Sequence, residues 1–224
     1  MLISLLSRVK GRPISFDRDV PAGYLLRLIG ARAIDYLRGV LLTRKGVFLA
    51  RSARVRHPSQ LFLGKGVEIG PYCLVDCLSR HGLTIGDSSK IGAYSFVKVS
   101  GSLSDLGDSI VIGRNVAIGE YAHIGGAGPV TIGDDTITGA YLSIHPENHN
   151  FDDISSAIRL QGVTRKGISI GKNCWIGAKV TILDGANIGD GCVIAAGAVV
   201  NQSFSDNQII GGIPAKVIGS RGSE

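Results

Sequence analysis

The segment from Ile144 to Asn150 holds two of the chain's five histidines, His145 and His149. Imidazole titrates near neutral pH, so such a side chain can take the proton from a weak nucleophile such as a hydroxyl group. A nearby carboxylate such as Glu147, or a backbone carbonyl, could hold the imidazole in one tautomer. The segment therefore indicates general-base chemistry. The remaining histidines are expected to be surface or structural residues: His57, His81 and His123.

Repeats of six residues surround this segment and must position it. They read Ile-Gly-x-x-small-x, most regularly from Ile170 to Val199. Hexapeptides of this kind are typical of a parallel β-helix, because one aliphatic and one small residue in six can point inward while glycine or another turn-former occupies each corner. Three hexads make one triangular coil, and each strand pairs with the strand one coil further on, at about 4.8 Å. The sequence therefore predicts an all-β solenoid.

Insertions interrupt the coils. Successive coils are expected to open at Leu63, Ile85, Ile112, Ile132, Ile170 and Ile188. Compared with a regular coil of 18 residues, these spacings contain insertions of 4, 9, 2, 20 and 0 residues. The insertion of 20 residues follows His149 and spans about 150–169. A long irregular loop on a compact solenoid is expected to be functional.

Residues 60–218 resemble the hexapeptide-repeat acetyltransferases. The resemblance is carried by the hexads, by the segment Ile144–Phe151, by Trp175 and by the closing run Gly212–Ile218. Among these enzymes, the chain looks most like the galactoside, maltose and bacterial polysaccharide O-acetyltransferases. The resemblance implies a left-handed parallel β-helix. It also implies transfer of an acetyl group from acetyl-CoA to a sugar hydroxyl, in the biosynthesis of surface polysaccharide or another glycan.

The resemblance also assigns roles to individual residues. His149, the last residue of its hexad, matches the general base, and an amide near Ala178 could stabilise the oxyanion formed from the thioester. Tyr121 stands where the sugar enzymes commonly have asparagine. The residues expected to contact the acceptor are His145, Glu147, Tyr121 and Arg165. The residues expected to contact acetyl-CoA are Trp175, Ala178, Ala196 and Lys216.

The chain departs from the family after the last full coil. A Thr-Lys pair often found there is Asn201-Gln202, so one charge that binds the CoA phosphates is missing. Lys166, Lys179 or Arg221 could replace it. In relatives the active site forms between neighbouring subunits of a trimer, so the resemblance implies a homotrimer in which the large loop frames the acceptor site.

Composition agrees with a soluble, cytoplasmic enzyme. No stretch of uncharged apolar residues is long enough for a transmembrane helix, and the start of the chain, Met1–Lys10, is a poor secretory signal. The four cysteines are therefore expected to be free thiols. Cys73 and Cys77 lack a second Cys/His pair at zinc-binding spacing, so no metal site is expected.

The first 60 residues are strongly basic, with twelve Lys/Arg and three Asp. Apolar residues recur at helical spacing and predict an amphipathic helix over about 21–42: Leu26, Ile29, Ala33, Leu37 and Leu41. The helix could cap the open end of the solenoid or attach shallowly to an anionic membrane face. Nucleic-acid binding is not expected, because no recognised binding module accompanies the charge. We expect a basic, partly helical arm or cap over 1–46, a β-helix domain over 47–218 and a tail over 219–224.

Three alternatives to sugar O-acetylation remain open. Acetylation of an amino sugar or of a xenobiotic amine would use the same chemistry. A zinc hydratase similar to the γ-class carbonic anhydrases shares the fold but needs three histidines at matching positions, and the spacing from His123 to His149 does not match whole coils. A non-catalytic scaffold is the third alternative.

Overall fold

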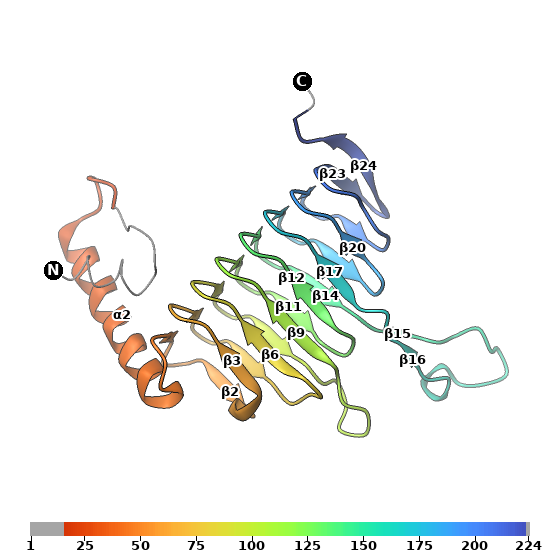
Figure 1. Cartoon of the computed structure of the whole chain (residues 1–224), viewed down its shortest axis with the longest axis horizontal. Helices are drawn as coiled ribbons and strands as arrows, with labels where there is room; N and C mark the ends of the chain where they lie inside the picture. Colours follow the sequence, from red (N-terminus) through yellow and green to blue (C-terminus); the bar gives the residue numbers. More distant parts are fainter. Residues whose placement is uncertain (1–15, 223–224) are drawn as a thin grey trace.

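The hexapeptide repeats wind into a parallel β-helix, and Figure 1 shows its coils stacked from the helix α2 at one end to β24 at the other. This computed structural model describes residues 16–222 of the chain. Each coil gives one short strand to each of three sheets, which we call A, B and C in the order in which the chain visits them. The predicted β-helix with an N-terminal helical element is confirmed.

The strands of the three sheets have the following bounds. Sheet A contains β1 (Phe48–Leu49), β4 (Glu68–Ile69), β7 (Lys90–Ile91), β10 (Ala117–Ile118), β13 (Ile137–Thr138), β18 (Trp175–Ile176), β21 (Val193–Ile194), β23 (Gln208–Gly212) and β24 (Ala215–Ser220). Sheet B contains β2 (Arg54–Arg56), β5 (Leu74–Asp76), β8 (Phe96–Lys98), β11 (His123–Gly125), β14 (Ser143–His145), β19 (Thr181–Leu183) and β22 (Val199–Val200). Sheet C contains β3 (Leu61–Leu63), β6 (Gly82–Ile85), β9 (Ser109–Ile112), β12 (Val130–Ile132), β17 (Ile168–Ile170) and β20 (Asn187–Ile188).

The strand register confirms the predicted coil openings. In sheet C the chain of partners runs Leu63, Ile85, Ile112, Ile132, Ile170 and Ile188. The insertions share one location that the spacing alone did not give. From sheet C to A and from A to B the equivalent residues are always six apart, as in Ile132, Thr138 and Ile144, so all extra residues leave at the corner between B and C.

Inward-pointing aliphatic residues fill the coils, and the cysteines join them. All four cysteines are buried free thiols. Burial raises the pKa of Cys73, Cys174 and Cys192. Burial, followed by the charge of neighbouring Asp76, raises the pKa of Cys77 to about 12. The small inward position that each hexad requires therefore explains these residues without redox chemistry.

The predicted amphipathic helix is present as α2 (Ala22–Thr43), but its leucines do not face the solenoid. Gly39 is buried against the backbone carbonyl of Val47. Leu26, Leu37 and Leu41 remain 71, 62 and 81 % exposed. The leucine stripe therefore points away from the first coil, which is the reverse of what a hydrophobic cap would show. The rest of the expected arm, residues 1–15, lies outside the described part of the chain.

Polar contacts attach α2 to the first two coils. Arg32 donates to Glu68 on sheet A at 2.6 Å, and the ring of Tyr36 lies 5.3 Å from that of Phe48. Arg38 donates to backbone carbonyls of the first coil, including that of Ala53 at 3.2 Å. Within residues 16–222, no helix is long and apolar enough to cross a membrane.

Candidate active site

His149 lies at the base of an arm that projects from the B–C corner. The arm begins after β14 and starts with β15 (Asn148–His149), which pairs antiparallel with β16 (Val163–Thr164), and the two strands are visible beside the coils in Figure 1. His149 pairs with Val163 in this ladder and its side chain is exposed. The predicted base is therefore carried on a short hairpin rather than on the regular coil.

Side chains within the arm fix the loop between its two strands. The Gln161 side chain donates to the carbonyls of Asp153 and Ser156, each at 2.8 Å. Asn150 donates to the carbonyl of Gln161 at 3.0 Å, and a 3₁₀ turn (Ile158–Leu160) precedes Gln161. These bonds satisfy buried and half-buried polar groups inside a segment that has little hydrophobic core.

Arg165 braces the root of the arm. Its Nε lies 2.7 Å from Oε2 of Glu147, and its guanidinium also lies 3.0 Å from Oδ2 of Asp105. Asp105 belongs to the insertion of nine residues two coils earlier. Asp184 closes the other side, because its buried carboxylate accepts from the amides of Lys166 at 3.0 Å and Gly167 at 2.8 Å. Glu147 and Arg165, predicted as acceptor contacts, thus hold each other, and their contact with an acceptor stays a prediction.

His145 belongs to an aromatic cluster on the outer face of sheet B. Its Nε2 lies 2.7 Å from Oγ of Ser143. Its ring meets the edge of His123 at 5.3 Å between centroids, and His123 in turn meets Phe96 at 5.4 Å. Partial burial, followed by the neighbouring His145, lowers the pKa of His123. The sequence did not reveal this cluster, because Phe96, His123 and Ser143 stack only through the insertions.

The residues predicted to hold acetyl-CoA lie elsewhere on the prism. Trp175 is 56 % exposed on the outer face of sheet A, and Lys216 is exposed on β24 of the same sheet. Ala178 and Ala196 occupy the A–B corner in adjacent coils, where the amide of Gly197 donates to the carbonyl of Ala178 at 2.9 Å. Within the described residues, the amides of Ala178 and Ala196 have no hydrogen-bond acceptor.

Of the basic residues that could replace the missing phosphate ligand, Lys179 is nearest in the chain to this corner. Lys166 lies at the B–C corner, and Arg221 donates to the carbonyl of Gly191 at 2.9 Å. Gln202, at the site of the missing lysine, donates to the carbonyl of Ala215 at 3.0 Å and so ties down the C-terminal hairpin.

Tyr121 also lies at the A–B corner and not beside His149. It belongs to a row of four exposed tyrosines, one in each of four successive coils: Tyr72, Tyr94, Tyr121 and Tyr141. The ring centroids are 4.9, 5.0 and 5.0 Å apart and the planes are within 9° of parallel. All four have positive φ, near 60°, a conformation that costs energy for a residue with a side chain. Within one chain, then, the structure separates Tyr121, Ala178 and Ala196 from His149.

A resident metal is not part of this arrangement. Among residues 16–222, no group of three His, Cys, Asp or Glu side chains is placed to hold a metal ion. His123 and His145 lie together on sheet B, whereas His149 lies on the arm and makes no ion pair or hydrogen bond with a carboxylate of the described chain.

Comparison with known proteins places these features in a family. Residues 167–202 match the model described as bacterial transferase hexapeptide (six repeats). The chain is 35 % identical, over 192 residues, to WbbJ of Escherichia coli, named as a putative lipopolysaccharide biosynthesis O-acetyl transferase, and the match covers 83 % of this chain and 86 % of that one. A probable acetyltransferase of Mycobacterium tuberculosis is 38 % identical over 162 residues, covering 72 % of this chain but only half of the longer relative.

A solved structure shows the same fold. A single-residue variant of AntD, an N-acyltransferase from Bacillus cereus, crystallised with dTDP-4-amino-4,6-dideoxyglucose and coenzyme A, superposes with a TM-score of 0.54 at 20 % identity. The match covers 80 % of this chain and 82 % of that one.

Proposed function

Because the chain belongs to the family of hexapeptide-repeat acetyltransferases, we propose that it transfers the acetyl group of acetyl-CoA to a sugar hydroxyl. The observation that carries the proposal is the placement of His149. An exposed imidazole stands at the base of a braced arm, where the two longest insertions, 20 and 9 residues, meet through Arg165.

His149 acts as the general base. It takes the proton of the acceptor hydroxyl while the oxygen attacks the carbonyl carbon of the thioester. The unpaired amide of Ala178 donates to the oxyanion that develops. When the carbon–sulfur bond breaks, the protonated His149 returns its proton to the CoA thiolate. A positioned base of this kind contributes about 10²–10⁴-fold to the rate.

The acceptor is a sugar of a surface polysaccharide or another glycan. WbbJ is named for lipopolysaccharide biosynthesis, and the AntD structure holds a nucleotide-linked amino sugar together with coenzyme A. His145, Glu147, Tyr121 and Arg165 contribute to the acceptor site, and Trp175, Ala178, Ala196 and Lys216 to the donor site. Lys179 supplies the phosphate contact that Gln202 lacks.

The active enzyme is a homotrimer. Within one chain, the donor residues Ala178 and Ala196 occupy the A–B corner and His149 the B–C corner, so one chain presents two half-sites. A neighbouring copy that brings its B–C arm to the A–B corner would complete the site, and Tyr121 would then approach a base on the other chain. We place the enzyme in the cytoplasm, with its N-terminal arm in contact with the inner membrane face.

A calorimetric titration of the metal-free protein with acetyl-CoA tests the proposal first. We expect one site per subunit with a micromolar dissociation constant. The variant His149→Ala should bind acetyl-CoA as the unmodified protein does and lose most acetyl transfer, measured as release of free thiol over a panel of sugar and amino-sugar acceptors. His145→Ala is the matched control and should retain more of the activity.

Several results would contradict the proposal. Absence of acetyl-CoA binding would favour a scaffold, or, with bound zinc, a metal hydratase. Transfer by His149→Ala at the unmodified rate would exclude this residue as the base. Transfer only to amines would replace O-acetylation by N-acetylation.

A further inference from the structure

The N-terminal end of the β-helix is only partly covered. Val55 and Leu61 of the first coil pair with Val75 and Leu83 of the second. The two second-coil residues are fully buried, whereas Val55 and Leu61 stay half-exposed. This difference arises because α2 docks along β1 and leaves the sides of the coil that carry sheets B and C open.

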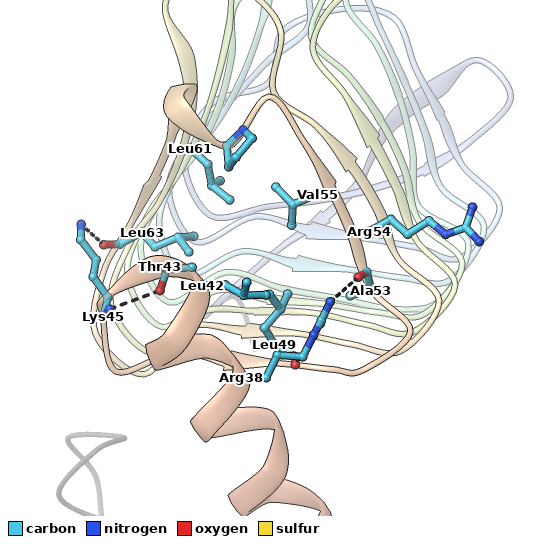
Figure 2. Close-up of a pocket in the computed structure, with 11 residues that line it drawn as sticks. Arg38, Leu42, Thr43, Lys45, Leu49, Ala53, Arg54, Val55, Leu61 and Leu63 are labelled. Carbon is cyan, nitrogen blue, oxygen red and sulfur yellow. Dashed lines mark hydrogen bonds between the residues drawn. The ribbon is translucent and has the colours of Figure 1, made fainter.

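A cavity of about 500 Å³ fills the open part, which is within the usual range for small-molecule sites. Figure 2 shows aliphatic side chains from α2 and from all three strands of the first coil around it. Its apolar lining consists of Leu42, Leu49, Ala53, Val55, Leu61 and Leu63. Such a lining fits a hydrocarbon chain.

The rest of the lining is cationic. Arg38, Lys45 and Arg54 border the cavity and no acidic residue lines it. Lys45 donates to the carbonyl of Leu63 at 2.8 Å, and Arg38 likewise donates to backbone carbonyls (Figure 2). A carbonyl carries no net charge, so these contacts orient the two cations without neutralising them. An apolar lining with a cationic border fits an amphiphile whose head group is anionic.

The leucine stripe of α2 continues from this cavity. Leu42 lines the cavity, and neighbouring Leu41 begins the exposed stripe that runs back through Leu37 and Leu26. The surrounding residues 16–60 contain nine Lys/Arg and three Asp. A helix with leucines on one face and arginines beside them matches the interfacial region of an anionic bilayer.

We propose that this end of the β-helix binds an anionic phospholipid at a membrane surface. The leucine stripe of α2 lies among the head groups, one acyl chain enters the cavity and the phosphate lies beside Lys45 and Arg54. This inference gives a site to the membrane contact proposed above and rests on it. Acetyl transfer takes place on other parts of the prism, so the two proposals can fail separately.

Charge argues against the other occupants of this surface. Residues 1–15 are long enough to return to the cavity but contain Arg8, Lys10 and Arg12 and no acidic residue. A second copy of the chain would bring one basic end against another. Both arrangements place like charges together, whereas the anionic lipid neutralises them.

Vesicle sedimentation tests the proposal on the full 224-residue chain. The probes are vesicles of phosphatidylcholine alone and of phosphatidylcholine mixed equally with phosphatidylglycerol. We expect binding to the mixed vesicles, weakened at least about tenfold by Leu37→Gln/Leu41→Gln and by Arg54→Glu. The matched controls are Leu103→Gln/Leu160→Gln and Arg159→Glu, which alter exposed residues of the two insertions and should bind as the unmodified chain does.

A soluble probe isolates the cavity from the helix surface. Dodecyl phosphate below its micelle concentration should bind by calorimetry at one site, and dodecyl maltoside should bind at least about tenfold more weakly. Val55→Phe, which fills the cavity, should abolish binding of dodecyl phosphate, while Leu37→Gln/Leu41→Gln should retain it. Thermal unfolding and acetyl-CoA binding of each variant report whether the fold and the donor site are intact.

Three results would overturn the inference. Equal binding to both kinds of vesicle would remove the role of charge. Undiminished vesicle binding by the leucine variant would place the membrane contact in residues 1–15. Binding of dodecyl phosphate by Val55→Phe at the unmodified affinity would show that the chain does not enter the cavity.

Discussion

Arg165 is the residue on which the position of the arm depends most directly. It contacts Glu147 and Asp105, so Arg165→Gln removes two ionic contacts at the root of the arm while keeping a side chain of similar length. Arg165 and Glu147 are 22 and 28 % exposed, and Asp105 is 50 % exposed. Partly exposed pairs contribute about 0.2–1 kcal/mol each. We therefore expect the local opening of the arm to become easier by about 1 kcal/mol.

Hydrogen exchange of the backbone amides measures this opening. The amide of Asn150, which donates to the carbonyl of Gly162 at 3.1 Å, and the ladder of β15 with β16 report the closed arm. A change of about 1 kcal/mol should accelerate their exchange about fivefold in Arg165→Gln. The amide of Thr181, bonded to Ala198 in the coils at 2.9 Å, should exchange as before.

Two further variants separate the ionic contacts from a general loosening. Arg159→Gln changes an exposed arginine of the same arm, which forms no ion pair within the described chain, and should leave exchange unchanged. Arg165→Gln combined with Asp105→Asn should be less severe than the sum of the single variants, because the two residues share one contact. If Arg165→Gln leaves exchange of the arm unaltered, or if Arg159→Gln accelerates it equally, the brace does not hold the arm.

Three more predictions follow from burial, charge and close packing. No cysteine should react with a thiol reagent at pH 8 until the chain unfolds, because burial raises the pKa of all four, that of Cys77 to about 12; rapid labelling of the native protein would contradict this. The lowered pKa of His123 means that the unfolded chain binds more protons below about pH 6.5. The stability linked to His123 should be complete above that pH and lost as pH falls towards the folded pKa, so His123→Phe should flatten denaturant stability between pH 7 and 5, and an unchanged slope would refute the assignment. Gly39→Ala should detach α2 and speed its hydrogen exchange, because a Cβ there meets the backbone of the first coil, whereas Gly30→Ala, which meets nothing within 4 Å, should slow it; equal effects would place the contact elsewhere.

Local periodicity was enough to predict the coils. Each coil opening from Leu63 to Ile188 was identified correctly, because the identity of an inward-pointing residue depends on its place in the hexad. The bounds of α2 were also predicted, from helical spacing. Which face of α2 meets the solenoid was not, because Gly39, Arg32 and Arg38 bind backbone and carboxylate groups that only the folded first coils bring together.

Contacts between insertions lie beyond such reasoning. Arg165 and Asp105 are 60 residues apart in the sequence, and nothing in either insertion indicates the other. The tyrosine row could have been found, since all four tyrosines occupy the same place in their hexads. It was missed because a single position, Tyr121, was compared with relatives instead of with its own neighbours in the stack.

The distribution of insertions around the prism bears on how one fold can serve different acceptors. From sheet A to B and from C to A every coil uses six residues, so these corners repeat without change along the solenoid, and the A–B corner carries Ala178 and Ala196. The B–C corner takes every insertion and carries His149. We infer that the invariant corner suits a donor whose extended arm is the same in every relative, while the variable corner adapts to the acceptor. On this reasoning, exchanging residues 150–162 for the loop of a relative should change which sugar is acetylated and leave the affinity for acetyl-CoA within about twofold. A loss of acetyl-CoA affinity in such a chimera, with the fold intact, would show that the two corners are not separable in this way.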